Sequence, residues 1–210
     1  GTGATGNTTH GYWGGGSGPS GNPLFSIVDR LDYSNDTTAC ATKGPLTVIV
    51  HQHSAESSRA NALPTEFVYS TTASSGEETL ETLSSGPAYG YIAGGYPGPN
   101  STVERIDFNN DTSTPAPRSL ITTARAWGAA TGNTSYGWFS GGSPGGTIVD
   151  RLDYGNDTAT ASARGYLSQA RYYLSAVGNN DYGYWGGGAV GGGEGSTVDR
   201  VDYGNDTATA

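Results

Sequence analysis

The stretch Thr147-Ile-Val-Asp-Arg-Leu-Asp-Tyr-Gly-Asn-Asp-Thr-Ala-Thr160 decides the fold of this chain, because the chain repeats it. Three further copies open with Val-Asp-Arg or Val-Glu-Arg and close with Asn-Asp-Thr, at Val28–Thr37, Val103–Thr112 and Val198–Thr207. Their arginines are 75, 46 and 49 residues apart, from Arg30 to Arg105 to Arg151 to Arg200. A recurring period in this range is typical of a solenoid or a propeller.

Each copy follows an aromatic segment that ends in a run of glycines. The four segments are His10–Gly16, Tyr89–Gly95, Tyr136–Gly142 and Tyr182–Gly188. A third element, seen in Arg118–Arg125 and Arg164–Arg171, leads into a short apolar stretch. One unit therefore holds about four strands: an inner strand, the aromatic strand, the Val-Asp-Arg strand and a Thr/Ala-rich outer strand such as Thr158–Ser162. Four antiparallel strands in a unit of this size predict a propeller blade.

Composition supports a single all-β domain over residues 1–210. Glycine occupies 35 positions, charged residues are only 14% of the chain, and Tyr, Thr and Val are abundant, which favours short strands over helices. The net charge of −9 opposes binding to nucleic acid or to anionic lipid. No apolar run reaches the length of a membrane span, and no signal-peptide pattern opens the chain. Because the chain begins with Gly and contains no Met, we expect a processed or partial product.

The segment 43–88 departs from the repeat. The β-branched runs at 46–53 and 65–70 each predict a strand, but the spacing of the other units is lost. Either one blade carries a long insertion here, or a degenerate fifth blade lies here with Tyr69 in the place of Tyr33 and Tyr154. We favour the fifth blade, because it divides the 75-residue interval into two of roughly ordinary length.

The order of these segments resembles the kelch family of repeats, whose unit has an apolar strand ending in Gly-Gly, a variable loop, a Tyr-Asp strand, a turn with Thr and an Arg-bearing stretch. Tyr184–Gly188, Val198–Tyr203, Asn205–Thr207 and Leu167–Arg171 carry the resemblance. Kelch units usually have Trp after the Thr turn, where this chain has Ala-Thr-Ala or Thr-Pro-Ala. The sequence of the repeats is also similar to that of kelch-like repeats of virion and tail-fibre proteins in aquatic bacteriophages. The resemblance implies a β-propeller in an extracellular or virion setting.

The repeated polar residues are interpreted as scaffold. Alternation along Val198–Tyr203 places Arg200 and Asp202 on one face, which suits an ion pair within a blade or between blades. The Asn-Asp-Thr copies are glycosylation sequons, but Asn and Asp also favour turns, so the turn explains them. Calcium at Asp202 and Asp206 is a lesser alternative. The single cysteine, Cys40, excludes an intrachain disulfide and is expected to be buried.

Two histidines carry the enzyme alternative. His51 and His53 lie two residues apart on an expected strand, hence on one face, where they could form a metal pair. No third ligand is evident, and neither a Gly-x-Ser-x-Gly motif nor a phosphate loop is present in the sequence. We therefore predict no cofactor and no metal, and a metal-dependent enzyme built on residues 47–88 remains the alternative function.

The loops after the Gly-Gly pairs carry the functional prediction. Propeller topology brings these loops to one face, and an aromatic residue lies near the start of each: Trp13, Tyr96, Trp138 and Trp185. Aromatic rings beside polar loops suit contact with sugar or protein, although rings packed between blades are the alternative for the tryptophans. The sequence thus predicts a non-enzymatic structural or interaction module, extracellular or on a virion, that contacts glycan or a protein partner within a larger assembly.

The last expectation concerns closure of the ring. The chain opens on an inner strand and finishes in an outer one, so it should hold whole blades. We predict a compact disc of four or five blades with adjacent termini, closed by packing of Tyr12, Trp13, Ile27 and Leu31 against Tyr184, Trp185, Val198 and Val201. An extended array would instead indicate a solenoid.

Overall fold

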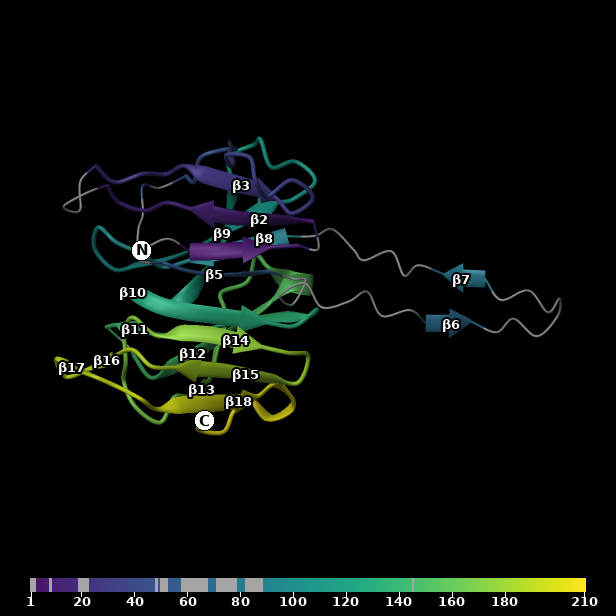
Figure 1. The fold of residues 1–210 in the computed structure, drawn as a ribbon. Helices are drawn as coiled ribbons and strands as arrows, with labels where there is room; N and C mark the ends of the chain where they lie inside the picture. Colours follow the sequence, from purple (N-terminus) through teal and green to yellow (C-terminus); the bar gives the residue numbers. More distant parts are fainter. Residues whose placement is uncertain are drawn as a thin grey trace.

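The computed structural model describes residues 3–7, 9–18, 23–47, 49, 53–57, 68–70, 79–81, 89–144 and 146–210, and these form antiparallel sheets (Figure 1). The predicted all-β class is confirmed. No helix in these ranges is long and apolar enough to cross a membrane.

Three sheets make up the body. The first has the order β1 (Gly3–Gly6), β2 (His10–Gly14), β3 (Val28–Asp32) and β4 (Ala41–Thr42). The second runs through β13 (Ser162–Tyr166), β12 (Ile148–Asp153), β11 (Tyr136–Ser143), β10 (Ala116–Gly132), β9 (Asn100–Asp107), β8 (Tyr89–Ala93) and β5 (Ser54–Ser57). The third has β14 (Ser175–Gly178), β15 (Tyr182–Gly186) and β18 (Val198–Asp202).

The seven-stranded sheet is two repeat units that share one long strand. The first part of β10 pairs with β9, and its second part, from Ala126 onward, pairs with β11. The pairing with β9 shifts in register between Leu120 and Arg125, and Trp127 has a positive φ of 66°. The strand therefore bends where one unit ends and the next begins, which gives four units along the chain.

The outer strand of a unit lies later than predicted. Thr158–Thr160 is turn and coil, and β13 starts only at Ser162, where the chain turns back to pair with β12. The Asn-Asp-Thr turn occupies the residues expected to be extended. The chain after Thr207 matches this turn, so the last sheet has three strands rather than the predicted four.

The predicted fifth blade is not formed by the described residues of 43–88. Within them, β5 joins the sheet of the second unit beside β8, and β6 (Val68–Ser70) pairs only with β7 (Thr79–Glu81). Tyr69 lies in this small hairpin, which Figure 1 shows apart from the sheets. The described residues 46, 47, 49 and 53 are not in a strand. The additional residues of this segment, 58–88, are therefore an insertion between the first strand (β5) and the second strand (β8) of one unit.

The units follow one another through their first strands. β1 contacts β5, β5 contacts β10, and β10 contacts β14. Figure 1 shows the first and last sheets at opposite ends of the body with β5 and β10 between them. In the described part of the chain, no extensive contact joins β1, β2 or β3 to β14, β15 or β18. The expected seam is absent because its residues pack elsewhere: Tyr12 and Val28 against the second unit, Trp185 and Val201 against the third.

A buried aspartate from the Asn-Asp-Thr turn of the second, third and fourth units joins each of these units to the one before it. Asp157 Oδ2 accepts hydrogen bonds from Tyr91 Oη (3.0 Å) and Arg105 Nη1 (2.8 Å). Its Oδ1 accepts from Arg118 Nε (3.0 Å) and Nη2 (2.8 Å). All three donors belong to the preceding unit. Burial alone would raise the pKa of Asp157, but the hydrogen bonds from Arg118 and Tyr91 and the charges of both arginines outweigh it and lower that pKa.

The same junction occurs three times. Asp111 is held by Tyr12, Arg30 and Lys43, and Asp206 by Trp138, Arg151 and Arg164. Beside each of these junction aspartates, two rings from adjacent units stack: Tyr12 on Phe108, Tyr91 on Tyr154, and Trp138 on Tyr203. The predicted ion pair between units exists, but the acceptor belongs to the next Asn-Asp-Thr turn. Asp202 instead accepts from Gly204 N (2.9 Å), and both oxygens of Asp206 are taken by N–H donors.

Cys40 is exposed, so the expected buried thiol is wrong. It precedes the two-residue strand β4 at the edge of the first sheet, whose residues are themselves exposed. No neighbouring strand covers this edge within the described chain, and the position therefore contributes nothing to the core.

Candidate binding site

Glycine pairs end the second strand of each unit and open the loops of one face. Gly94 and Gly95 have φ of 75° and 116°, and Gly141 and Gly142 have 70° and 92°, values that residues with a Cβ rarely adopt. The N–H groups of Gly95 and Gly142 donate to the carbonyls of Arg125 and Arg171, where the chain enters the next unit. Each pair therefore fixes the crossing between units beside the following loop.

Buried arginines hold these crossings. Arg125 Nη2 donates to Asp150 Oδ2 (2.7 Å) and to the Phe139 carbonyl (2.9 Å), and its side chain is 3% exposed. Arg171 pairs likewise with Asp199 and donates to the carbonyl of Thr197. The buried, hydrogen-bonded arginines thus fix the position of the residues that directly follow them, which lie on the loop face.

Aromatic rings gather there. Tyr96 stacks on Trp127 with ring centroids 6.1 Å apart, and Trp127 meets Tyr173 edge-on at 5.8 Å. Tyr172 lies 6.2 Å from Trp127 and 5.0 Å from Tyr173. Tyr96 is 40% and Tyr173 57% exposed. We call these four residues the aromatic cluster.

The backbone of the aromatic cluster is strained at two positions. Trp127 (φ 66°) and Tyr173 (φ 58°) are the non-glycine residues with positive φ in the described chain. Tyr173 N donates to the Trp127 carbonyl (2.9 Å), which ties the two strained residues together. Bulky residues in this region cost on the order of 1–3 kcal/mol each, and such strain clusters at ligand sites.

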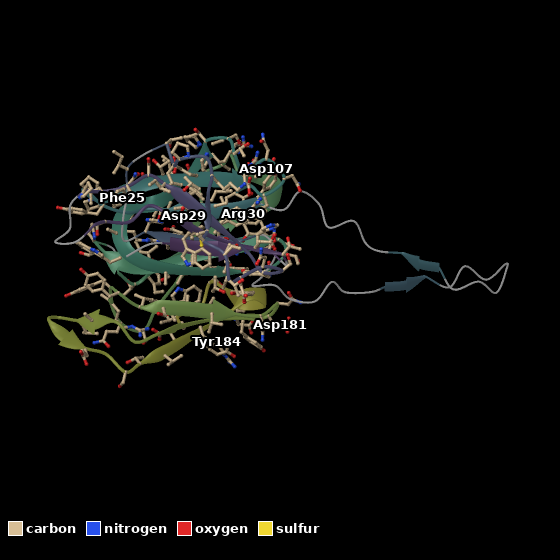
Figure 2. The ribbon with its side chains drawn as sticks, turned by 45° about the horizontal axis from the view of Figure 1, so that its top comes forward. Phe25, Asp29, Arg30, Asp107, Asp181 and Tyr184 are labelled. Atoms are coloured by element: carbon tan, nitrogen blue, oxygen red, sulfur yellow. The ribbon has the colours of Figure 1, made fainter. Side chains whose placement is uncertain are left out.

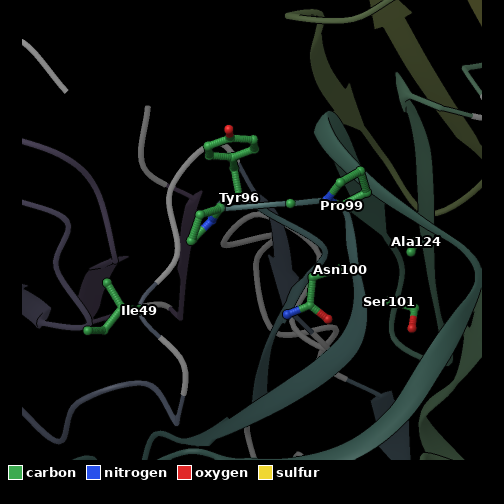
Figure 3. A pocket seen from close by; sticks show the side chains of 8 residues that line it. Ile49, Tyr96, Pro99, Asn100, Ser101 and Ala124 are labelled. Carbon is green, nitrogen blue, oxygen red and sulfur yellow. The ribbon is translucent and has the colours of Figure 1, made fainter. Parts of the chain in front are cut away.

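Two open hollows flank the aromatic cluster. One, of about 380 Å³, is lined by Tyr96, Pro97, Gly98, Pro99, Asn100, Ser101, Ile49 and Ala124 (Figure 3). The other, also of about 380 Å³, is lined by Tyr173, Gly188, Ala189, Glu194 and Gly195. Flat rings between hollows with amide, hydroxyl and carboxylate groups can contact a ligand that has both apolar faces and hydroxyls.

The four predicted site residues divide between this face and the interior. Tyr96 lies in the aromatic cluster. Trp138 and Trp185 are fully buried, with their indole N–H groups donating to Asp206 and to the Ala129 carbonyl, so the packed alternative holds for them. Trp13 is half-buried and lines a different hollow, of about 310 Å³, with Gly11 and Tyr33 on the first sheet. The structure does not bring the four together.

Sequence reasoning missed Trp127, Tyr172 and Tyr173. The short apolar stretches after Arg125 and Arg171 are predicted to be inner strands, but Tyr172 and Tyr173 precede β14, and Trp127 lies at the bend within β10. The available signal was the aromatic residue one or two positions after Arg125 and Arg171. A pattern of apolar residues cannot separate a ring that faces a neighbouring sheet from one that faces solvent at a strand end.

The predicted metal pair is described only in part. His51 lies outside the described residues. His53 is buried, and its Nε2 accepts a hydrogen bond from Gly3 N (2.9 Å), which occupies the lone pair that a metal ion would need. Within the ranges that the structure describes, no group of three or more His, Cys, Asp or Glu side chains could hold a metal ion.

No protein-family model matches the chain, and no curated protein matches it either.

Proposed function

We propose that this chain is a non-enzymatic binding module that takes carbohydrate on its loop face, through the aromatic cluster. The observation that carries the proposal is the pair of strained, tied residues Trp127 and Tyr173 within a set of rings that remain partly open to solvent. Strain at exposed aromatic positions has no value for packing. It is explained if the rings must present their faces to a ligand.

The chemistry of the cluster fits a sugar. The ring of a pyranose has an apolar face that packs on an aromatic side chain, while its hydroxyls need donors and acceptors at the rim. Asn100 and Ser101 lie in the hollow beside Tyr96, and Glu194 lies in the hollow beside Tyr173. The net charge of −9 favours a neutral or cationic glycan over a polyanionic one.

The proposal includes kelch-like, propeller-type blades in an open array, because the first and last sheets lie at opposite ends of the body and do not close a ring within the described part of the chain (Figure 1). Four units in chain order, inner strands in mutual contact and loops gathered on one face support it. Display outside the cell or on a virion, as part of a larger assembly, belongs to the same proposal and rests on the similarity of the repeats to kelch-like repeats of virion and tail-fibre proteins.

A glycan array followed by calorimetry of the best ligand tests the function. Tyr96→Ala and Tyr173→Ala should each weaken binding at least about tenfold, which corresponds to roughly 1.4 kcal/mol. Tyr166→Ala is the matched control, since this tyrosine is 53% exposed on β13 and lies outside the cluster. Binding that is equally weakened by Tyr166→Ala, or an array without any bound glycan, would overturn the proposal. Capture of a protein that depends on Tyr173 would assign the face to a protein partner instead.

A further inference from the structure

Among the described residues, the first and the last of the four units leave complementary halves of a junction unoccupied. On the last sheet, the residues that match the donors of the other junctions are Tyr184 and Arg200. On the first sheet, the residues that match the stacking ring and the junction aspartate are Tyr33 and Asp36. We call the first set the donor face and the second set the acceptor face. Figure 2 shows the labelled Tyr184 and Arg30 on opposite end sheets of the body.

Exposure marks both faces as unfilled. Asp36 is exposed and makes no hydrogen bond or ion pair with a described residue, whereas Asp111, Asp157 and Asp206 are at most 8% exposed. Tyr33 is 47% exposed, whereas Phe108 and Tyr203 are buried. Arg200 is exposed and forms no ion pair in the described chain, although its guanidinium lies 4.7 Å from the centroid of the Tyr182 ring.

Steric fit between inner strands also indicates that the two end faces are complementary. A Cβ at Gly90 would meet Thr5 Cγ2 from the first unit, and a Cβ at Gly183 would meet Thr131 Cγ2 from the third. In these two of the three junctions, a methyl group from the inner strand of one unit thus enters a space that glycine leaves open in the next. The position that matches Thr5 and Thr131 in the last unit is Val177, as the pairing of these residues with Tyr12, Trp138 and Tyr184 shows.

Val177 fills no such space in the part of its own chain that the structure describes. Its side chain is 62% exposed, although it lies on an inner strand. The matching space exists on the first sheet, where Gly6, Gly11, Trp13 and Tyr33 line the hollow of about 310 Å³. The chain therefore carries an exposed apolar knob at one end and an open hole of the corresponding kind at the other.

We propose that the donor face of one copy docks on the acceptor face of a second copy, head to tail. Val177 enters the hollow beside Gly11, Tyr184 stacks on Tyr33, and Arg200 pairs with Asp36 of the second copy. The occupant is inferred from the chain itself, since the same sequence supplies both halves of a contact that it already makes three times. Steric fit and opposite charge agree on the same pairing. A contact of this kind closes into a ring or continues as a filament, depending on the rotation between copies.

Sedimentation velocity and light scattering over a concentration series test the proposal. The wild-type chain should form dimers or larger species at increasing concentration. Asp36→Arg and Arg200→Asp should each remain a single copy, as should Val177→Asp. An equimolar mixture of Asp36→Arg with Arg200→Asp should associate again, because the exchanged charges face each other in the mixed contact. Glu194→Arg is the control, since it makes a comparable charge change on an exposed residue of the loop face.

Two results would overturn the proposal. One is a wild-type mass of a single chain up to several hundred micromolar. The other is association that neither charge reversal reduces. Unfolding midpoints measured for every variant show whether a loss of association reflects loss of the fold, and recovery in the mixture cannot arise from misfolded chains.

Discussion

Removal of one junction aspartate should destabilise the fold far more than removal of its counterpart on the end unit. Asp157 is 5% exposed and accepts four hydrogen bonds from Tyr91, Arg105 and Arg118. In Asp157→Ala these donors lose the carboxylate that joins them, and two arginines that are 22% and 29% exposed remain partly desolvated. Breaking a buried pair in this way costs about 3–5 kcal/mol. Because both arginines are partly exposed, we expect the free energy of unfolding to fall by about 3 kcal/mol.

Urea unfolding followed by tryptophan fluorescence measures the effect, because Trp138 is buried within the same sheet. Asp36→Ala is the matched control: it removes the same residue from the same Asn-Asp-Thr motif, at a site where no donor from the described residues reaches the carboxylate. Measured at concentrations where the chain is a single copy, it should change the free energy of unfolding by less than about 0.5 kcal/mol. Equal losses for the two variants, or a loss below about 1 kcal/mol for Asp157→Ala, would refute the reasoning.

Three further predictions follow from single sites. Burial raises the pKa of Glu104 from 4.5 to about 7, so the folded state holds this proton more tightly than the unfolded state. The free energy of unfolding should therefore fall by up to about 3 kcal/mol as pH rises from 4.5 through 7. In urea titrations at each pH, Glu104→Gln should flatten this slope and the control Glu194→Gln should not. Gly141→Ala should lower the free energy of unfolding by about 2–4 kcal/mol, because the new Cβ would overlap Leu174 and the residue has a positive φ. Gly191 also has a positive φ, but no described atom lies within 4 Å of the Cβ position. Gly191→Ala should therefore cost only about 1 kcal/mol in the same assay. Cys40 should react with a thiol reagent in the native protein as fast as in urea, and strong protection would contradict its exposure.

The raised pKa of Glu104 reflects a missing partner. In the third and fourth units the matching carboxylates, Asp150 and Asp199, pair with Arg125 and Arg171. Alignment of Leu46 with Leu167 places Val50 at the position of Arg171. Glu104 keeps the hydrogen bond from Thr47 N (3.0 Å), as Asp199 keeps that from Ser168 N, but it has no arginine in an ion pair within the described chain. The second unit thus has Val50 in place of the arginine and Glu104 in place of the aspartate, which leaves a buried carboxylate without the ion pair of its counterparts among the described residues.

The sequence predicts the units well because strand patterns are local. Glycine runs, alternation and turn residues are read within ten residues, and the second and third strands of each unit lie where these signals place them. The first and last strands of a unit lack such signals. Ser175–Gly178 and Ser162–Tyr166 are defined by pairing with a neighbour, so their limits depend on contacts that no short window contains.

The candidate site was predicted only through Tyr96, for a physical reason. Ring exposure depends on whether the neighbouring unit covers a position. Trp138 occupies the same position of the repeat as Tyr184, and Trp185 the same position as Trp13, yet the first of each pair is buried and the second is only half-buried. The sequence also cannot predict which aspartate pairs with each arginine. The repeat contains several aspartates, and the packing of two units determines which of them lies beside the arginine.

The junctions preserve chemical roles and not residue types. The ring donor is Tyr, Tyr or Trp, the stacking ring is Phe, Tyr or Tyr, and the second cation is Lys, Arg or Arg. Only the aspartate and the first arginine are the same in all three. This explains why the insertion in the second unit leaves the repeat intact: it enters between β5 and β8, whereas Tyr91, Arg105 and Arg118 all follow it in the chain. Seventy-five residues therefore separate Arg30 from Arg105 without changing the junction that either one makes.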